Sequence, residues 1–274
     1  MKKKDKMYPY RILSPLLCFL IKLYYHPKVI GKENIPKEGS ILIVGNHIHL
    51  YDQFLAIMAT KRPVHYMAKK EYFDGKFAWF FKMGGCISVD RSKKDDKAVS
   101  SALEVLNNDW ALGLFPEGTR NSLKEERIKE LFEKYIKDLS YEEFYKKIKQ
   151  NKTSQINYLE ELLTRNVISN DDFLKNMYDA DYYLRKLVSS NKITEEDYNE
   201  HILLPFKFGA VSMAKKTDSY LIPFGISGDY KFRSKNLTIQ FGKPFKTTEN
   251  LEEDNKKLEK EVRNIIIKNK NNEK

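Results

Sequence analysis

The chain has 274 residues, which can hold one large domain or two modest ones, and 41% of them are hydrophobic, as in ordinary globular proteins. Charged residues make up 32%, and the formal net charge of +11 predicts anionic partners: phosphorylated small molecules, anionic lipid surfaces or nucleic acid. The two cysteines, Cys18 and Cys86, are too few for a disulfide framework, which agrees with a reducing, cytosolic setting.

The N-terminal segment, residues 1–27, combines a basic start with an apolar run. Between Arg11 and Lys22 only ten consecutive residues are uncharged, whereas a helix that crosses a bilayer needs ~20 apolar residues. No small-residue cleavage site follows, so a signal peptide is not indicated. Basic residues flank a core rich in Leu, Phe and Tyr, which predicts an interfacial helix on an anionic membrane surface. A first helix that packs on the protein core would give the same pattern, and both interpretations can hold.

From Gly31 onward, short apolar runs alternate with stretches long enough for helices. Runs of four to six aliphatic or β-branched residues that end at Gly or Pro are typical of buried strands, so the pattern predicts an α/β fold with a mixed central sheet flanked by helices. The expected strands lie within residues 40–46, 85–91, 110–118, 219–228 and 236–245. Residues 251–270 have the apolar spacing of a helix, and a polar, frayed tail is expected after it.

Residues 121–200 differ in charge and pattern from the rest of the chain. They hold 14 Lys and Arg against 17 Asp and Glu, a net charge of −3, which leaves +14 for the remainder. They contain no strand-like run, and "NVISNDDF" and "NKITEEDY" repeat at an offset of 25, each with Ser or Thr three residues before an acid, as at helix starts. We therefore expect residues 121–200 to form an all-helical insert within an α/β domain made of residues 28–120 and 201–274.

The stretch "LIVGNHIHLYDQF" places two histidines and an aspartate directly after an expected strand. Residues five apart lie ~140° away from a common face on one helix, so His47 and Asp52 can meet only if the chain turns between them. Gly45 ends the strand and Asp52 is expected to open a helix, which puts His47 at the carboxyl end of a strand, where α/β proteins bind ligands. An imidazole beside a carboxylate there predicts acid–base chemistry.

A metal site is the competing interpretation of the same stretch. Binuclear metallohydrolases have a His-x-His-x-Asp-His pattern, but here the acid comes one residue late and no histidine follows it. His26, His65 and His201 stand at no recognisable ligand spacing, so we expect no metal.

Two further motifs place charged residues at expected strand ends. "FPEGTR" combines a proline turn, a glycine that allows close backbone approach, and Glu, Thr and Arg side chains that can bind hydroxyl and phosphate oxygens. "VDR" places Arg91 at the end of another strand. Taken alone, a solvated turn and a surface salt bridge explain these motifs equally well.

Four blocks in order, "NHIHLYD", "GCISVDR", "FPEGTR" and "LIPFGI", resemble the motifs of the glycerolipid acyltransferases, in particular the 1-acyl-glycerol-3-phosphate (lysophosphatidate) acyltransferases. The resemblance runs from about Lys28 to Arg120 and resumes from about Leu204 to Phe245, so the material between is expected to be an insertion. It implies a membrane-associated enzyme that moves a fatty acyl group from acyl-CoA or acyl carrier protein to the free hydroxyl of 1-acyl-glycerol 3-phosphate, with no cofactor, giving phosphatidic acid in phospholipid synthesis.

The resemblance also implies roles for individual residues. His47 would be the general base and Asp52 would orient its imidazole. The acceptor would be bound by Arg91, Glu117, Gly118, Thr119 and Arg120. Asn46 would support the turn. Many family members have serine where this chain has His49, so His49 is either an accessory polar contact or a neutral change.

Two alternatives remain open from the sequence. The acceptor could be another lysophospholipid, an ornithine lipid or glycerol 3-phosphate, because the motifs recognise a shared core. A non-catalytic membrane-surface protein would also use the basic charge. The basic residues are not concentrated in one helix or interleaved with stacking aromatics, so we expect no nucleic-acid partner. We expect a peripheral or monotopic protein on the cytoplasmic face of the cell membrane.

Overall fold

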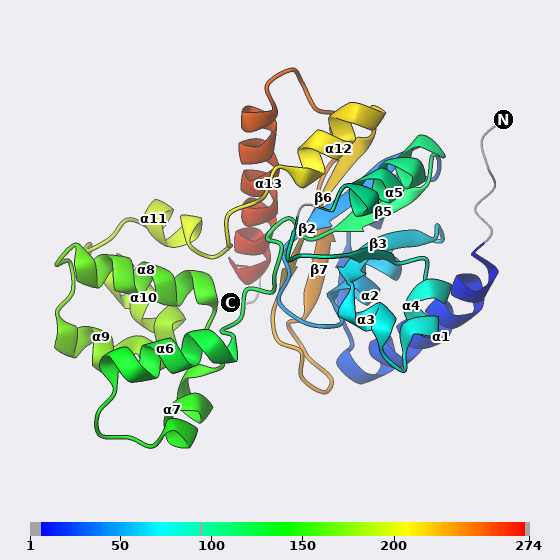
Figure 1. Cartoon of the computed structure of the whole chain (residues 1–274). Helices are drawn as coiled ribbons and strands as arrows, with labels where there is room; N and C mark the ends of the chain where they lie inside the picture. The colour runs from blue at the N-terminus through cyan, green and yellow to red at the C-terminus, as the bar shows by residue number, and fades with distance from the viewer. Residues whose placement is uncertain (1–6, 94, 272–274) are drawn as a thin grey trace. The chain divides into compact units, whose positions relative to one another are not determined.

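The computed structural model describes residues 7–93 and 95–271, and the chain divides into two compact units (Figure 1). The first unit comprises Met1–Thr119 and Pro205–Lys274, and the second comprises Arg120–Leu204. The second unit therefore begins one residue earlier and ends four residues later than the expected insert of 121–200. The basic start at residues 1–6 and the polar tail at 272–274 lie outside the described residues.

A mixed sheet forms the centre of the first unit, in the order β1-β7-β6-β2-β5-β3-β4. All neighbouring strands pair in parallel except β6 and β7, which are antiparallel. This arrangement confirms the predicted mixed α/β sheet. The strands are β1 (Lys28–Ile30), β2 (Ile41–Gly45), β3 (Val64–Lys69), β4 (Ile87–Val89), β5 (Ala111–Leu114), β6 (Tyr220–Ser227) and β7 (Thr238–Phe241).

Strands β1 and β3 were not among those expected from the sequence. β1 has only three residues, too few for a recognisable apolar run. β3 reads "VHYMAK", in which His65 and Lys69 interrupt the apolar pattern. Its first three residues are nevertheless buried and pair with β5, while its last three pair with β4.

Helices cover both faces of the sheet, so β2 is buried at every residue (Figure 1). Ile41 and Ile43 belong to a core cluster with Tyr10 of α1 and Leu55 of α2. On the other face, α12 packs against α5 and α13, and α13 packs along β6. The helical segments of this unit are α1 (Tyr8–Tyr25), η1 (Lys32–Asn34), α2 (Asp52–Ile57), α3 (Glu71–Asp74), α4 (Ala78–Met83), α5 (Asp96–Asn107), α12 (Gly209–Thr217) and α13 (Leu251–Asn271).

Helix α1 has two apolar faces. On its inner face, the hydroxyl of Tyr10 accepts a hydrogen bond from the backbone N–H of Val64 (3.2 Å), and Cys18 packs against the core cluster. On its outer face, the large side chains are more than half exposed, and they are Ile12, Leu16, Phe19, Leu20 and Leu23. Among the described residues, no helix has both the length and the apolar character needed to span a bilayer.

The second unit is entirely helical in its described structure. Its helical segments are α6 (Glu125–Tyr135), α7 (Tyr141–Ile148), α8 (Thr153–Thr164), α9 (Asn170–Asn176), η2 (Met177–Asp179), α10 (Ala180–Ser189) and α11 (Glu195–Glu200). The sequence repeat corresponds to a helix–turn–helix connection. In each copy an asparagine with positive φ, Asn166 or Asn191, ends one helix, and Ser169 or Thr194 accepts a backbone hydrogen bond at the start of the next.

Candidate active site

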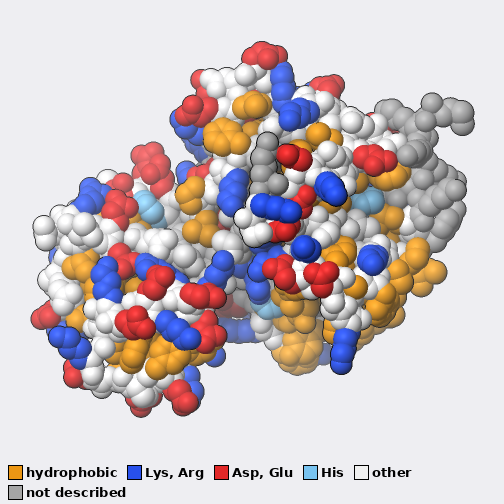
Figure 2. Space-filling view, viewed as in Figure 1, with side chains coloured by type: hydrophobic (Ala, Val, Ile, Leu, Met, Phe, Trp, Pro, Cys, Tyr) orange, Lys and Arg blue, Asp and Glu red, His pale blue; other side chains and the backbone are white. Residues whose placement is uncertain are grey.

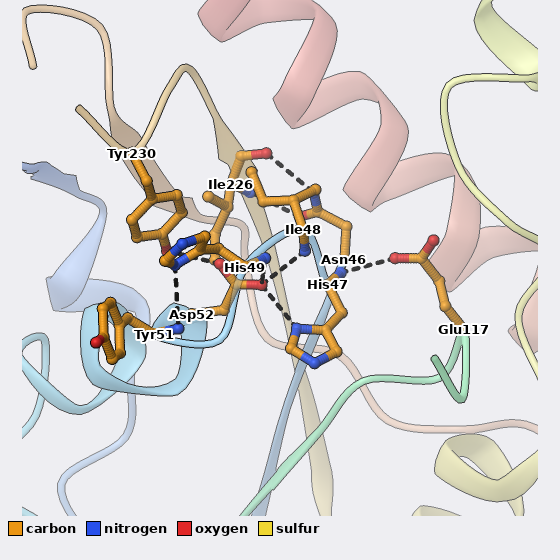
Figure 3. Close-up of polar contacts among 9 residues, drawn as sticks. All are labelled: Asn46, His47, Ile48, His49, Tyr51, Asp52, Glu117, Ile226 and Tyr230. Carbon is orange, nitrogen blue, oxygen red and sulfur yellow. Dashed lines mark hydrogen bonds and ion pairs between the residues drawn. The ribbon is translucent and has the colours of Figure 1, made fainter. Parts of the chain in front are cut away.

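The candidate site lies at one edge of the sheet, where three parallel strands end. β2 pairs with β5 on one side and with β6 on the other, and both pairs are parallel. Their carboxyl ends therefore lie together, and the residues that follow them, His47, Glu117 and Tyr230, come within reach of one another (Figure 3). These three positions are far apart in the sequence.

The His47–Asp52 pair forms at this edge. Nδ1 of His47 lies 2.7 Å from Oδ2 of Asp52. Because a carboxylate is an acceptor, Nδ1 carries the proton and Nε2 is left as the basic nitrogen. Nε2 points away from Asp52 (Figure 3), no hydrogen bond from the described residues reaches it, and the side chain of His47 is 19% exposed. The geometry is that of a general base open to a ligand.

The chain turns between His47 and Asp52 because Asp52 holds the turn by its side chain. Oδ2 of Asp52 also accepts hydrogen bonds from the backbone N–H groups of Ile48 (2.6 Å) and His49 (2.8 Å). Asp52 is the first residue of α2 and is completely buried. The predicted turn and the predicted helix start are therefore both present.

Gly45 and Asn46, which precede the turn, fix the direction in which β2 ends. A side chain at Gly45 would meet the backbone oxygen of Phe224 at 2.3 Å, so only glycine allows this approach of the neighbouring strand. The side-chain amide of Asn46 then donates to the backbone oxygen of Ile226 (2.9 Å) and accepts from its N–H (2.7 Å). Asn46 thus extends the β2–β6 pairing by one residue through its side chain.

The "FPEGTR" segment contacts His47 from the side of β5. The ring of Phe115 stacks on the imidazole at a centroid distance of 4.2 Å and an angle of 15°. Oε1 of the buried Glu117 accepts a hydrogen bond from the backbone N–H of His47 (2.7 Å). Glu117 therefore orients the turn between His47 and Asp52, a contact that the sequence did not predict for a residue expected to bind the acceptor.

Tyr230, which follows β6, completes the surroundings of Asp52. Its hydroxyl donates to Oδ1 of Asp52 (2.6 Å), and its ring stacks on His49 at 4.0 Å. His49, expected as an accessory polar contact or a neutral change, also accepts from the backbone N–H of Tyr51 (3.3 Å). Sequence reasoning missed Tyr230 because it lies in no motif. Its position just after a strand parallel to β2 is the signal that could have found it.

A lysine packs over the glycine of the "FPEGTR" turn. Gly118 has φ +71°, and a side chain there would lie 2.8 Å from Nζ of Lys207. The backbone N–H of Lys207 donates to the carbonyl oxygen of Pro116 (3.0 Å), which anchors the segment before α12 to this turn. Sequence reasoning did not select Lys207.

Three residues that were predicted to bind the acceptor have no described contact with the His47–Asp52 pair. Arg91 is exposed and follows β4, which is separated from β2 by β5 and β3, a lateral distance of about 14 Å at ordinary strand spacing. Thr119 is half-buried and ends the first segment of its unit, and Arg120 is exposed and begins the second unit. Their role in binding an acceptor stays a prediction.

No three His, Cys, Asp or Glu side chains within the described ranges are grouped so as to hold a metal ion. Cys86 and Cys18 are free thiols, and burial raises the pKa of each to about 11. Both are therefore neutral thiols at physiological pH rather than activated nucleophiles.

Comparison with known proteins gives one family. Residues 26–227, almost three quarters of the chain, match the family model described as Acyltransferase, which confirms the resemblance seen in the four motifs. The chain is also 30% identical over 115 residues to the 1-acyl-sn-glycerol-3-phosphate acyltransferase of Bacillus subtilis, and 33% identical over 103 residues to that of Borreliella burgdorferi. These alignments cover 41% and 36% of this chain, and 58% and 41% of the relatives.

The chain therefore spans about half the length of the curated relatives that it matches. Among solved structures, the 1-acyl-sn-glycerophosphate acyltransferase of Thermotoga maritima has a similar fold, with a TM-score of 0.53 and 17% sequence identity. That similarity covers 94% of this chain and 77% of the other.

Proposed function

The chain belongs to the acyltransferase family, and from this premise we propose that it transfers a fatty acyl group from a thioester to the free hydroxyl of 1-acyl-glycerol 3-phosphate. The observation that carries the proposal is the His47–Asp52 pair, in which Nδ1 is held by a buried carboxylate and Nε2 is left open. The names of the relatives support the choice of substrate.

In the proposed reaction, Nε2 of His47 takes the proton as the acceptor hydroxyl attacks the thioester carbonyl carbon. Asp52 keeps the imidazole in the required tautomer and stabilises the imidazolium that forms. The new C–O bond produces a tetrahedral intermediate. Its collapse breaks the C–S bond, and the imidazolium returns the proton to the leaving thiolate of coenzyme A or acyl carrier protein. No acyl-enzyme and no cofactor are needed.

The acceptor phosphate would be bound near the "FPEGTR" turn. Lys207 contributes a cation there, since its side chain packs over Gly118 and makes no ion pair with a described residue. Arg91, Thr119 and Arg120 are further candidates by family resemblance, and an arginine can bind a phosphate through two parallel hydrogen bonds. Glu117 would act indirectly by orienting His47 through its backbone.

Helix α1 would place this site at a membrane surface. Figure 2 shows hydrophobic side chains gathered at the lower right, over the place of α1 and α4 in Figure 1. Exposed large side chains of these elements include Phe19 of α1 (61%) and Phe77, which immediately precedes α4 (70%). A patch of this kind in a basic protein fits an anionic bilayer, where both acyl substrates reside. We therefore propose a peripheral or monotopic protein on the cytoplasmic face of the cell membrane.

Product analysis tests the acceptor directly. Purified protein in mild detergent is given a long-chain acyl-CoA or acyl carrier protein with lysophosphatidate, lysophosphatidylcholine or glycerol 3-phosphate, and the lipids are identified by mass spectrometry. We expect phosphatidic acid from lysophosphatidate in excess of any other product. A faster reaction with another acceptor would identify that lipid as the preferred substrate. If no combination of donor and acceptor gives a product, the proposal is wrong.

A further inference from the structure

The two oxygens of the buried Asp52 carboxylate have different hydrogen-bond donors, and Tyr230 donates to one of them, Oδ1. Oδ2 accepts three hydrogen bonds, from Nδ1 of His47 and from the backbone N–H groups of Ile48 and His49. Oδ1 accepts from the hydroxyl of Tyr230 alone among the described residues. In Figure 3 Asp52 lies between the imidazole and Tyr230. The phenol therefore supplies the one hydrogen bond to Oδ1 among the described residues.

The loop between β6 and β7 holds Tyr230 in this place. Its ring is fixed on one side by the stacked His49 and on another by the edge of Tyr25, at a centroid distance of 5.3 Å. Further along the loop, the backbone N–H of Arg233 donates to the backbone oxygen of Tyr24 (2.7 Å), and Phe232 contacts the Tyr24 ring. The loop is thus anchored to the last turn of α1 while Tyr230 reaches Asp52.

The phenol remains a donor at every working pH. Burial, and then the charge of Asp52, raise the pKa of Tyr230 far above its usual value. A phenolate would place a second negative charge against the same buried carboxylate. Tyr230 can therefore share the charge of Asp52 through its hydrogen bond without itself exchanging a proton.

We propose that Tyr230 is a positioning residue of the His47–Asp52 pair, and that its hydroxyl sets how strongly Asp52 holds a proton on His47. The effect of Tyr230 on turnover rests on the proposed function. Without this donor, more negative charge would lie on Oδ2, which faces the imidazole, and the carboxylate would lose the bond that fixes its plane. His47 would then stay protonated to a higher pH and would be less available as a base at neutral pH.

Other titratable groups also surround the pair, and Tyr230→Phe leaves their side chains in place. They are Glu117 after β5, Tyr66 in β3, Tyr25 in α1 and His49 in the turn itself. Among the described residues, none of them donates to Oδ1 of Asp52. A change in the behaviour of His47 in Tyr230→Phe can therefore be assigned to the lost phenol.

A substrate-free titration tests the proposal. In Tyr230→Phe, the imidazole of His47 is followed by NMR of protein labelled at histidine, with the His47 signal identified from its loss in His47→Ala. We expect its midpoint to rise by about half a pH unit to one unit. The matched control is Tyr25→Phe, which removes a neighbouring phenol that makes no hydrogen bond to Asp52, and we expect an unchanged midpoint. An unchanged midpoint in Tyr230→Phe would overturn the proposal.

Kinetics in two backgrounds separate positioning from general structural support. Tyr230→Phe should lower kcat about tenfold, the effect of one lost hydrogen bond to a charged group. The acid limb of the pH profile of kcat/KM should shift to higher pH. In an Asp52→Asn background the same change should cost less than about twofold, because its target is gone. An equal loss in both backgrounds would contradict the proposal. If wild-type protein has no transferase activity, the proposed function fails, but the NMR titration still tests the role of Tyr230.

Discussion

Asp52 orders the candidate active site because four hydrogen-bond donors converge on one buried carboxylate. Two are backbone groups of the turn, and they explain why the chain reverses between His47 and Asp52. The sequence predicted this much, since five residues on one helix could not bring the two side chains together. It could not predict Tyr230, which is 178 residues away along the chain and meets Asp52 only through the strand order.

A prediction for a single residue concerns the charge of Lys207. Lys207→Met keeps the aliphatic contact with Gly118 and removes the charge. We expect the KM for lysophosphatidate to rise about tenfold, as for the loss of one charged hydrogen bond to phosphate, with kcat within about threefold of the wild type. Steady-state kinetics at fixed acyl donor measure both values.

The control for that variant is Lys216→Met, which removes an exposed charge further along the same segment, in α12. It should leave the KM unchanged. An equal rise in both variants would show that net charge, rather than a phosphate contact, determines the affinity.

At the scale of elements, α1 shows why two interpretations of the N-terminal segment could both hold. Tyr10 and Cys18 face the core, whereas Leu16 and Phe19 face outward. We expect Leu16→Ser combined with Phe19→Ser to weaken sedimentation with anionic vesicles at least tenfold, since each buried apolar side chain contributes about 1.5–3 kcal/mol. Thermal stability should be retained because both side chains are exposed.

A matched control lies in the second unit. Tyr182 is 64% exposed, so Tyr182→Ser removes a comparable exposed ring that belongs to the second unit. It should leave vesicle binding unchanged. Vesicle binding that is unaltered in the α1 variant would contradict a membrane role for this helix.

Helix starts in the second unit give a prediction with a pH dependence. The hydroxyl of Thr194 accepts from the backbone N–H of Asp197 (3.0 Å) and donates to its carboxylate (2.7 Å). Hydrogen bonds from the side chain and backbone of Thr194 hold the pKa of Asp197 below its usual value. A carboxylate with a lowered pKa stabilises the fold above its unfolded pKa of ~3.9, and the contribution is lost as the pH falls through the folded value.

Thr194→Ala should therefore lower the free energy of unfolding by about 1 kcal/mol at pH 7, and the difference from wild type should narrow below about pH 4. Thermal or urea unfolding followed by circular dichroism at several pH values measures it. Thr164→Ala is the control, because its hydroxyl donates to the backbone oxygen of Glu160 inside α8 and caps no helix start. A difference that widens in acid would contradict the capping account.

Across the whole molecule, strands that lie in long apolar runs, such as β2 and β6, were predictable, whereas β1 and β3 were not. β2 and β6 are buried along almost their whole length and were expected from Leu, Ile and Val runs. β3 was not predicted because His65 and Lys69 break its apolar pattern, although its first three residues are buried. The sequence placed His47 and Asp52 at a strand end, but contacts among strand ends, such as Glu117 to His47, depend on strand order, which periodicity does not encode.

The second unit has a core of its own, which makes its independence testable. Phe144, Leu159, Phe173 and Leu184 are fully buried within it, and Tyr198 donates to Asp181 (2.8 Å). We expect a fragment of residues 120–204 to give a helical circular dichroism spectrum and a cooperative thermal transition. A spectrum of an unfolded chain would show that this unit needs the rest of the protein to fold.

The most direct test of the account is the release of free thiol from a long-chain acyl thioester, measured with and without lysophosphatidate in the wild type and in His47→Ala. We predict release that requires lysophosphatidate and falls at least a thousandfold in the variant, because the general base is lost while the fold is retained. Circular dichroism and vesicle binding should match the wild type. Release at the wild-type rate in His47→Ala would contradict the assignment of His47 as the base.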